Sequence, residues 1–341
     1  MSVPETFEYK SIPVPLPWHF EQWQRLVLQL QAGRCPHALL LTGPEGLGKR
    51  QFAAAFTALA LCEQPRAGQA CGECKDCRLW MAGSHPDFLQ VEPEKPGGPL
   101  KVEQIRQLGN FVSRTSGRGG ARLVCLSPAE AMNINAANAL LKNLEEPAAS
   151  VIFVLITDAP MGLLPTIRSR CQSIAFPPPT EEIALQWLYS NGLEEPLAQR
   201  VLTLAGGAPL LAAELAEPKP REVREQFLKD LDAVAQGTAS AVSTAGRWEA
   251  PAEGVELVQL LLFWQHWLTQ MVQIRSCDLS GDAQLMSLLQ RLPGLGEQSL
   301  QPVFAFYDHL LQARKGLLGT ANPNRRLLLE ELFIRWAKLF A

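Results

Sequence analysis

The sequence lacks a hydrophobic run long enough to cross a membrane, a large excess of charge and a recognisable export signal. Its longest purely apolar stretch, Val151 to Ile156, is far shorter than the roughly 20 residues of a spanning helix. Residues 1–17 carry prolines and acidic side chains and no apolar run typical of a signal peptide. The net charge of only -3 excludes wrapping of nucleic acid by bulk charge. We therefore expect a soluble, cytoplasmic protein with no membrane attachment.

Four of the eight cysteines lie close together, namely Cys62, Cys71, Cys74 and Cys77. Since a cytoplasmic protein keeps its thiols reduced, such a cluster indicates a metal rather than disulfides. Four thiolates can surround Zn²⁺ as a tetrahedron, and a site with every position filled by protein is structural. An iron–sulfur cluster, a redox pair and buried free thiols are the alternatives. We expect His85, which follows the cluster, to pack or to form hydrogen bonds instead of binding the metal.

The hydrophobic pattern divides the chain into three regions. Apolar strands alternate with helices over residues 1–178, which predicts an α/β domain with a parallel sheet covered on both faces. Residues 179–217 predict a small domain of short helices, a lid, and residues 218–341 predict an all-α domain that begins at a proline-rich linker, 218–220. The expected strands are His37–Thr42, Arg122–Leu126, Val151–Thr157 and Gln172–Phe176.

A glycine-rich turn joins the first expected strand to the helix after it. The turn reads Gly43-Pro-Glu-Gly-Leu-Gly48-Lys49. In this order of strand, turn and helix, backbone N–H groups at the helix N-terminus hold phosphate oxygens, and the lysine reaches the outer phosphates. The pattern predicts descent from a P-loop protein, with Gly43, Gly48 and Lys49 as the phosphate-binding residues.

The residues that hold Mg²⁺ in an active P-loop ATPase are missing. The position after the lysine calls for a Ser or Thr hydroxyl, and here it is Arg50. The strand at 122–126 lacks a terminal acidic pair and runs into Ser127 and Pro128; we expect Glu130, beyond the proline, to be a surface helix residue. Because phosphoryl transfer relies on the metal to neutralise charge, we expect no ATP hydrolysis by this chain alone. Binding of ATP without turnover and a loop kept only for packing both stay open.

A short arginine-containing segment, Pro165-Thr-Ile-Arg168-Ser-Arg170-Cys171, follows the third expected strand. The planar guanidinium group suits phosphate oxygens, and an arginine at a domain surface can stabilise the charge on a phosphoryl group in an adjacent subunit. A surface arginine in a salt bridge explains the spacing equally well.

Taken together, these features resemble the clamp-loader family of AAA-type ATPase relatives. The resemblance is carried by the P-loop remnant, the cysteine insertion after it, and three further stretches, Gly83–Phe88, Asn135–Pro147 and Pro165–Cys171. It covers residues 15–180, and Leu204-Ala-Gly-Gly-Ala-Pro209 extends it through the lid. The implied fold is a parallel-sheet P-loop domain of AAA type with a zinc module at 62–77, followed by a helical lid and an all-α collar.

The resemblance also implies a function. Arg50 and Pro128 depart from the pattern of the motor subunits, so it implies a subunit that does not hydrolyse ATP. It implies that Arg170 acts in trans as an arginine finger for a neighbouring ATPase subunit. The implied partners are motor subunits of the gamma/tau type and a delta subunit in a hetero-pentameric ring. This ring loads the sliding clamp on primed DNA as part of a replicative DNA polymerase holoenzyme.

Two other functions make different predictions. An active P-loop ATPase with an unusual metal site predicts turnover by the purified chain that Lys49→Ala abolishes. A zinc-dependent DNA-binding module predicts salt-sensitive DNA affinity that is lost when Cys74 is replaced. The missing metal ligands argue against the first function, and the near-neutral net charge argues against the second.

Overall fold

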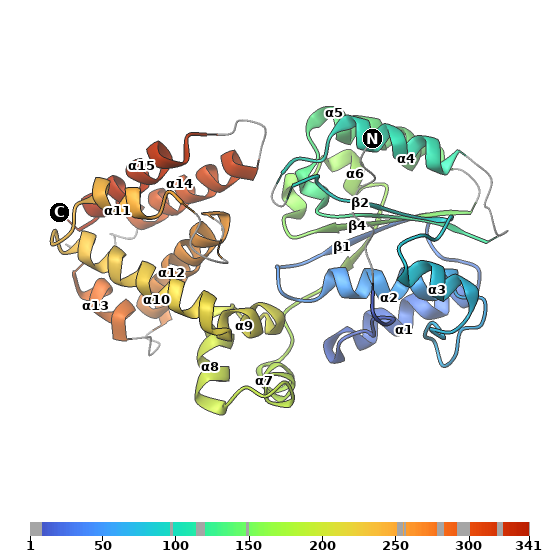
Figure 1. Cartoon of the computed structure of the whole chain (residues 1–341), viewed down its shortest axis with the longest axis horizontal. Coiled ribbons are helices and arrows are strands. Elements are labelled where there is room, and N and C mark those ends of the chain that lie inside the picture. The colour runs from blue at the N-terminus through green and yellow to red at the C-terminus, as the bar shows by residue number, and fades with distance from the viewer. Residues whose placement is uncertain are drawn as a thin grey trace. The chain divides into compact units, whose positions relative to one another are not determined.

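The structure, a computed structural model, describes residues 9–95, 98–113, 120–147, 150–250, 255, 257–277, 283–291, 301–318 and 323–340. The chain divides into two compact units, Met1–Trp187 and Leu188–Ala341, which are described separately (Figure 1). In these described ranges, no helix combines the length and the apolar character that a bilayer crossing requires. The division of the second unit into a lid and a collar stays a prediction.

The first unit is built on a parallel sheet of five strands in the order β2-β3-β4-β1-β5. In chain order the strands are β1 (Ala38–Thr42), β2 (Phe88–Val91), β3 (Arg122–Leu126), β4 (Val151–Thr157) and β5 (Gln172–Ala175). Every residue of β3 and β4 is buried, as expected for strands with helices on both faces. The register pairs Thr42 with Thr157, so β1 and β4 end side by side.

Helices cover both faces of this sheet, with α1, α2 and α3 on one side and α4, α5 and α6 on the other (Figure 1). Leu40, Phe153 and Leu155 on one face of the strands form a core with α4 and α5, and Phe52 and Phe56 of α2 are fully buried. The helical elements are η1 (Pro17–His19), α1 (Phe20–Gln31), α2 (Lys49–Leu61), α3 (Lys75–Met81), α4 (Val102–Val112), η2 (Ala129–Ala131), α5 (Ile134–Glu145), η3 (Pro160–Gly162) and α6 (Pro165–Arg168).

In its described part, the second unit consists of helices. Helix α7 (Glu181–Ser190) crosses the boundary between the units. Phe227, Trp264, Phe333 and Trp336 are fully buried and belong to one aromatic core. The remaining helices are α8 (Glu195–Leu204), α9 (Pro209–Ala216), α10 (Pro218–Ala235), α11 (Ala241–Arg247), α12 (Leu257–Cys277), α13 (Ala283–Arg291), α14 (Gln301–Leu318) and α15 (Arg325–Lys338).

The prediction of an α/β domain with a parallel sheet and a glycine-rich loop after its first strand, followed by helices, is confirmed. Two details differ from the sequence analysis. The edge strand β2 was not expected, because four residues beside a loop are too short to show a period. The stretch Pro218-Lys-Pro220 is no linker but the first turn of α10. Proline fits there because the first N–H groups of a helix have no partner within it.

Candidate functional site

The glycine-rich loop leaves β1 and enters α2 as the sequence predicts. Gly43, Gly46 and Gly48 have φ values of 148°, 78° and 81°, which side-chain-bearing residues rarely adopt. A Cβ atom on Gly43 would lie 2.3 Å from the carbonyl oxygen of Phe176, so this turn packs directly against the chain after β5. Gly48 is the N-cap of α2, and Lys49 is its first residue. The structure therefore brings the three predicted phosphate-binding residues together in one loop.

The ammonium group of Lys49 lies inside this loop. Its Nζ donates to the carbonyl oxygens of Gly43 at 2.6 Å and Pro44 at 2.5 Å. It also forms an ion pair of 2.6 Å with Oδ1 of Asp158, the residue that follows β4. Only 3% of the lysine side chain is exposed. A buried ammonium group needs such partners, because its desolvation is costly without them.

The neighbouring Arg50 points to another acidic residue. Its Nη1 lies 3.2 Å from Oε1 of Glu92, which also accepts a hydrogen bond of 2.9 Å from Gln90. Glu92 follows β2, the strand paired with β3. At the end of β3, where an active P-loop ATPase has an acidic residue, this chain has the buried Ser127. A guanidinium–carboxylate pair thus stands beside the loop where an ATPase needs a hydroxyl and a carboxylate for Mg²⁺.

The segment before α1 fixes the middle of the loop. The carbonyl oxygen of Leu47 accepts a hydrogen bond of 3.0 Å from the indole of Trp18 and lies 2.7 Å from Nε2 of His19. His19 Nδ1 accepts the N–H of Leu16, so its Nε2 carries the proton and donates to Leu47. Burial lowers the pKa of His19 from 6.5 to about 4, which keeps it neutral at pH 7.

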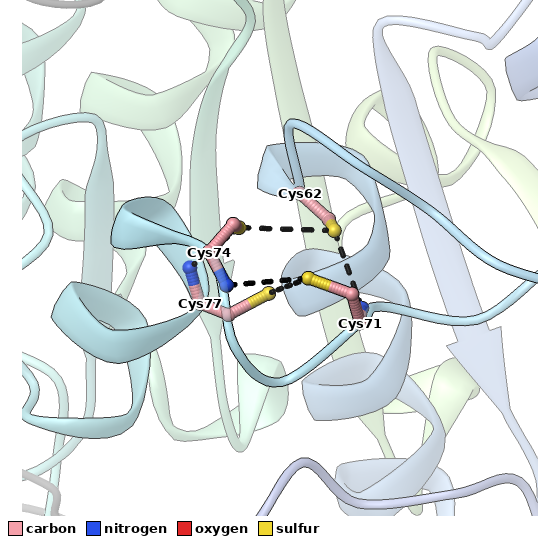
Figure 2. A group of neighbouring side chains, drawn as sticks. All are labelled: Cys62, Cys71, Cys74 and Cys77. Atoms are coloured by element: carbon pink, nitrogen blue, oxygen red, sulfur yellow. Dashed lines mark hydrogen bonds between the residues drawn. The ribbon is translucent and has the colours of Figure 1, made fainter.

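The four clustered cysteines form the second candidate site. Cys62 caps the end of α2, Cys74 caps the start of α3, and Cys77 lies within α3. Figure 2 shows their sulfur atoms turned toward one another. The Sγ atoms of Cys62 and Cys74 are 4.0 Å apart, those of Cys71 and Cys77 are 3.9 Å apart, and all four lie within 4.8 Å of one another. Sulfur ligands around a tetrahedral Zn²⁺ ion are about 3.8 Å apart, so the residues fit.

Backbone N–H groups also point at these sulfur atoms. Cys71 donates to the sulfur of Cys62, Cys74 to that of Cys71 and Cys77 to that of Cys74, at 3.3 to 3.4 Å. The N–H groups of Cys74 and Glu73 lower the pKa of the Cys71 thiol to about 6. Burial raises the pKa of Cys77, which opposes ionisation without a cation. Since a metal binds thiolates, the four thiols make a site that could hold a metal ion.

His85 is outside this set, as predicted. Its Nε2 lies 3.4 Å from Oδ1 of Asp76, and its Nδ1 accepts the N–H of Asp87. Both His85 and Asp76 are buried. The contact joins α3 to the segment that precedes β2, so His85 packs and forms hydrogen bonds, as expected of it.

The third candidate, Arg170, lies just after α6 and belongs to neither cluster. Its Nη2 is 2.7 Å from Oε1 of Glu145, the last residue of α5, and its Nη1 donates to the carbonyl oxygen of Thr166 at 3.0 Å. About a third of the side chain is exposed. The guanidinium group is therefore oriented by its own domain and still reachable from solvent.

Sequence reasoning missed two acidic residues at the loop, Asp158 and Glu92. Each directly follows a strand, and carboxyl ends of parallel strands meet at one edge of a sheet. That rule could have identified Asp158, because β4 was expected. Glu92 could not be found, because β2 was not expected. Glu130 is also more than a surface residue, since it is half-buried in η2 and accepts the N–H of Asp158 at 3.0 Å.

Comparison with known proteins identifies the family to which the chain is similar. The model of a family described as DNA polymerase III, delta subunit, matches residues 18–180. The chain is 40% identical over 326 residues to the DNA polymerase III subunit delta' of Pseudomonas aeruginosa, covering 95% of this chain and 97% of that protein. It is 32% identical over 330 residues to the Escherichia coli delta' subunit, covering 94% of each. It is 29% identical over 335 residues to the tau subunit of Salmonella typhimurium, covering 90% of this chain and 50% of that protein.

The similarity to two delta' subunits runs over nearly the full length of all three chains. The residues that the family model matches include the glycine-rich loop, the cysteine cluster and the segment of Arg170. The chain therefore belongs to the family of DNA polymerase III delta' subunits, which are clamp-loader components.

Proposed function

We propose that this chain is a non-hydrolysing subunit of the replicative clamp loader and supports ATP-driven loading of the sliding clamp on primed DNA. The observation that carries the proposal is the ion pair of Arg50 and Glu92 beside the loop. A positive guanidinium group repels Mg²⁺ and offers no oxygen to it, and a carboxylate bound to arginine is less available as a ligand. Without the metal, the charge that develops in phosphoryl transfer is not neutralised.

Arg170 is proposed to act in trans, as an arginine finger for the ATP site of a neighbouring motor subunit. An exposed ion pair such as the one with Glu145 contributes about 0–1 kcal/mol, so phosphate oxygens can replace the carboxylate at little cost. The bond to the Thr166 carbonyl can persist while the other face of the guanidinium group turns outward. An ATP site at such an interface stays incomplete until a neighbour supplies its arginine.

The cysteine cluster is proposed to hold a structural Zn²⁺ ion. All four ligand positions are occupied by Cys62, Cys71, Cys74 and Cys77, which leaves no open position for a substrate. The ion would tie the end of α2 to α3 and would supply no step of the reaction.

The proposed partners are motor subunits of the gamma/tau type and a delta subunit in a hetero-pentameric ring in the cytoplasm. The similarity of this chain to a tau subunit supports a ring of related subunits. Through that ring the chain would act on the sliding clamp and primed DNA as part of the DNA polymerase III holoenzyme, a DNA-directed DNA polymerase. Its last 124 residues, 218–341, are proposed to form the collar that holds the ring together.

The test is DNA-dependent ATP hydrolysis by the reconstituted loader with this chain as wild type, Arg170→Ala or Arg170→Lys. Loss of an arginine finger lowers turnover about 10³-fold or more at the one site that it serves. We therefore expect Arg170→Ala to remove the share of total turnover that this site carries, and a several-fold fall where the other sites of the ring depend on it. Lysine should restore little of it, because it lacks the planar fork.

Arg106→Ala is the matched control, since Arg106 is an exposed arginine whose ion pair with Glu103 is 3.9 Å long. Size-exclusion chromatography checks that each ring assembles. If rings with Arg170→Ala assemble and turn over ATP at the wild-type rate, the arginine finger is refuted. If the purified chain alone hydrolyses ATP in a way that Lys49→Ala abolishes, the non-hydrolysing role is refuted.

A further inference from the structure

The buried ammonium group in the glycine-rich loop is already surrounded by oxygens of the chain itself, through two hydrogen bonds and one ion pair. Lysine offers three N–H donors. In Lys49 they face the oxygens of Gly43, Pro44 and Asp158, all at 2.5 to 2.6 Å. Two of these acceptors are neutral carbonyls of the loop itself, and the third is a carboxylate. The Asp158 carboxylate therefore occupies the position beside Lys49 that a phosphate group takes in a nucleotide-binding loop.

Hydrogen bonds fix the backbone beside the Asp158 carboxylate, and the carboxylate itself remains accessible to solvent. The N–H of Asp158 donates to Oε1 of Glu130, and the next N–H, of Ala159, donates to the hydroxyl of Thr157. The turn after β4 thus fixes the backbone from which the carboxylate reaches Lys49. The Asp158 side chain itself is 38% exposed, so an anion in solution can reach the position that it occupies.

The charges around the loop explain why phosphate from solution competes poorly with Asp158 for Lys49. The described ion pairs at this loop contain two cations, Lys49 and Arg50, and two carboxylates, Asp158 and Glu92. A site that attracts phosphate needs a net positive potential, and here acidic residues outnumber basic ones, because Glu45 in the loop and Glu130 beside Asp158 add to the two paired carboxylates. Removal of the Asp158 charge would reduce this negative excess by one.

We propose that Asp158 is an internal substitute for phosphate, which keeps the loop closed to nucleotides. The ligand class that the loop would accept is a polyphosphate free of divalent metal, because Arg50 stands where the metal ligand belongs. Neutralisation or displacement of the Asp158 carboxylate opens the site. This inference deepens the proposed function and rests on the proposal that the loop hydrolyses no nucleotide.

The experiment measures binding of ADP and of inorganic pyrophosphate to the full-length chain by calorimetry, first with EDTA and then with Mg²⁺. Asp158→Asn keeps the shape of the side chain and removes its charge. We expect it to bind both probes at least ~10-fold more tightly than wild type, because a charge-assisted bond to Lys49 no longer competes. The gain should not need Mg²⁺, and a second substitution, Lys49→Met, should abolish it.

Two controls isolate the charge at this position. Asp158→Glu keeps a carboxylate and should bind the probes as weakly as wild type. Asp232→Asn removes a carboxylate from an exposed ion pair with Arg291 in the second unit and should change nothing. Asp158→Ser repeats the measurement with a second neutral residue, and thermal unfolding confirms that each variant is folded.

Several outcomes would overturn the inference. Equal affinity of wild type and both neutral variants would show that Asp158 does not compete with phosphate. A gain that requires Mg²⁺ would contradict a metal-free site, and a gain for ADP but not for pyrophosphate would contradict recognition of the phosphates. Hydrolysis of ATP by the wild-type chain would instead refute the proposed non-hydrolysing function, while tighter binding by Asp158→Asn would still support the internal substitute.

Discussion

Removal of metal from the cysteine cluster should unfold one defined part of the first unit. The part in question, residues 62–82, contains a single helix of seven residues, α3. Isolated helices of this length are not stable in water. The buried residues of its core are Ala54, Ala58 and Trp80, with the ring of Tyr9 stacked on the indole at 4.6 Å between centroids. So small a core cannot hold the segment without the four thiolates joined through a metal.

The magnitude follows from Trp80, which is fully buried. If α3 leaves its place, the packing of this indole is lost, and loss of a buried aromatic side chain costs about 3–5 kcal/mol. We therefore expect Cys71→Ser to lower the free energy of unfolding by about 3–5 kcal/mol. Cys35→Ser is the control, because Cys35 is a half-buried cysteine outside the cluster and should leave bound metal unchanged.

Metal content by mass spectrometry, urea unfolding and hydrogen exchange of residues 62–82 form the assay. The wild-type chain should contain one zinc ion, and a chelator should raise exchange in this segment while the second unit keeps its protection. If Cys71→Ser retains the metal, or unfolds at the same urea concentration as wild type, the structural-zinc argument is wrong.

Two further predictions concern the glycine-rich loop. Since His19 has a pKa of about 4 when folded and 6.5 when unfolded, the unfolded chain binds more protons between these values, and stability falls as pH falls through this window. His19→Gln should therefore lose about 2 kcal/mol less unfolding free energy than wild type between pH 7.5 and 5.0, measured with urea; equal losses would contradict a neutral buried imidazole. Gly43→Ala should destabilise the chain by more than the ~1–3 kcal/mol of an unfavourable φ alone, because its Cβ would overlap the Phe176 carbonyl. Gly33→Ala, with φ +64° and open space around the Cβ, measures the φ contribution by itself, and equal melting temperatures for the two variants would contradict the overlap.

The sequence determined those features whose physical causes are local. Backbone N–H groups and glycines at a strand–helix junction make a phosphate loop wherever they occur, so Gly43, Gly48 and Lys49 could be identified from their order. Cysteines with two residues between them bring their sulfur atoms together through one short turn, so the cluster was also predictable. The alternation of strands and helices was sufficient for the fold class and for the helical second half.

Only the tertiary structure decided which charges meet at the loop. Asp158 and Glu92 are separated from Lys49 and Arg50 in sequence, and they reach the loop because parallel strands place their carboxyl ends at one edge of the sheet. The order of these strands depends on long-range packing that no local pattern reports, and β2 is too short to show one. The same holds for Arg170, whose partner Glu145 comes from the end of another helix. The sequence therefore shows that a phosphate loop is present, and the strand order determines that Lys49 of this loop is paired with the carboxylate of Asp158.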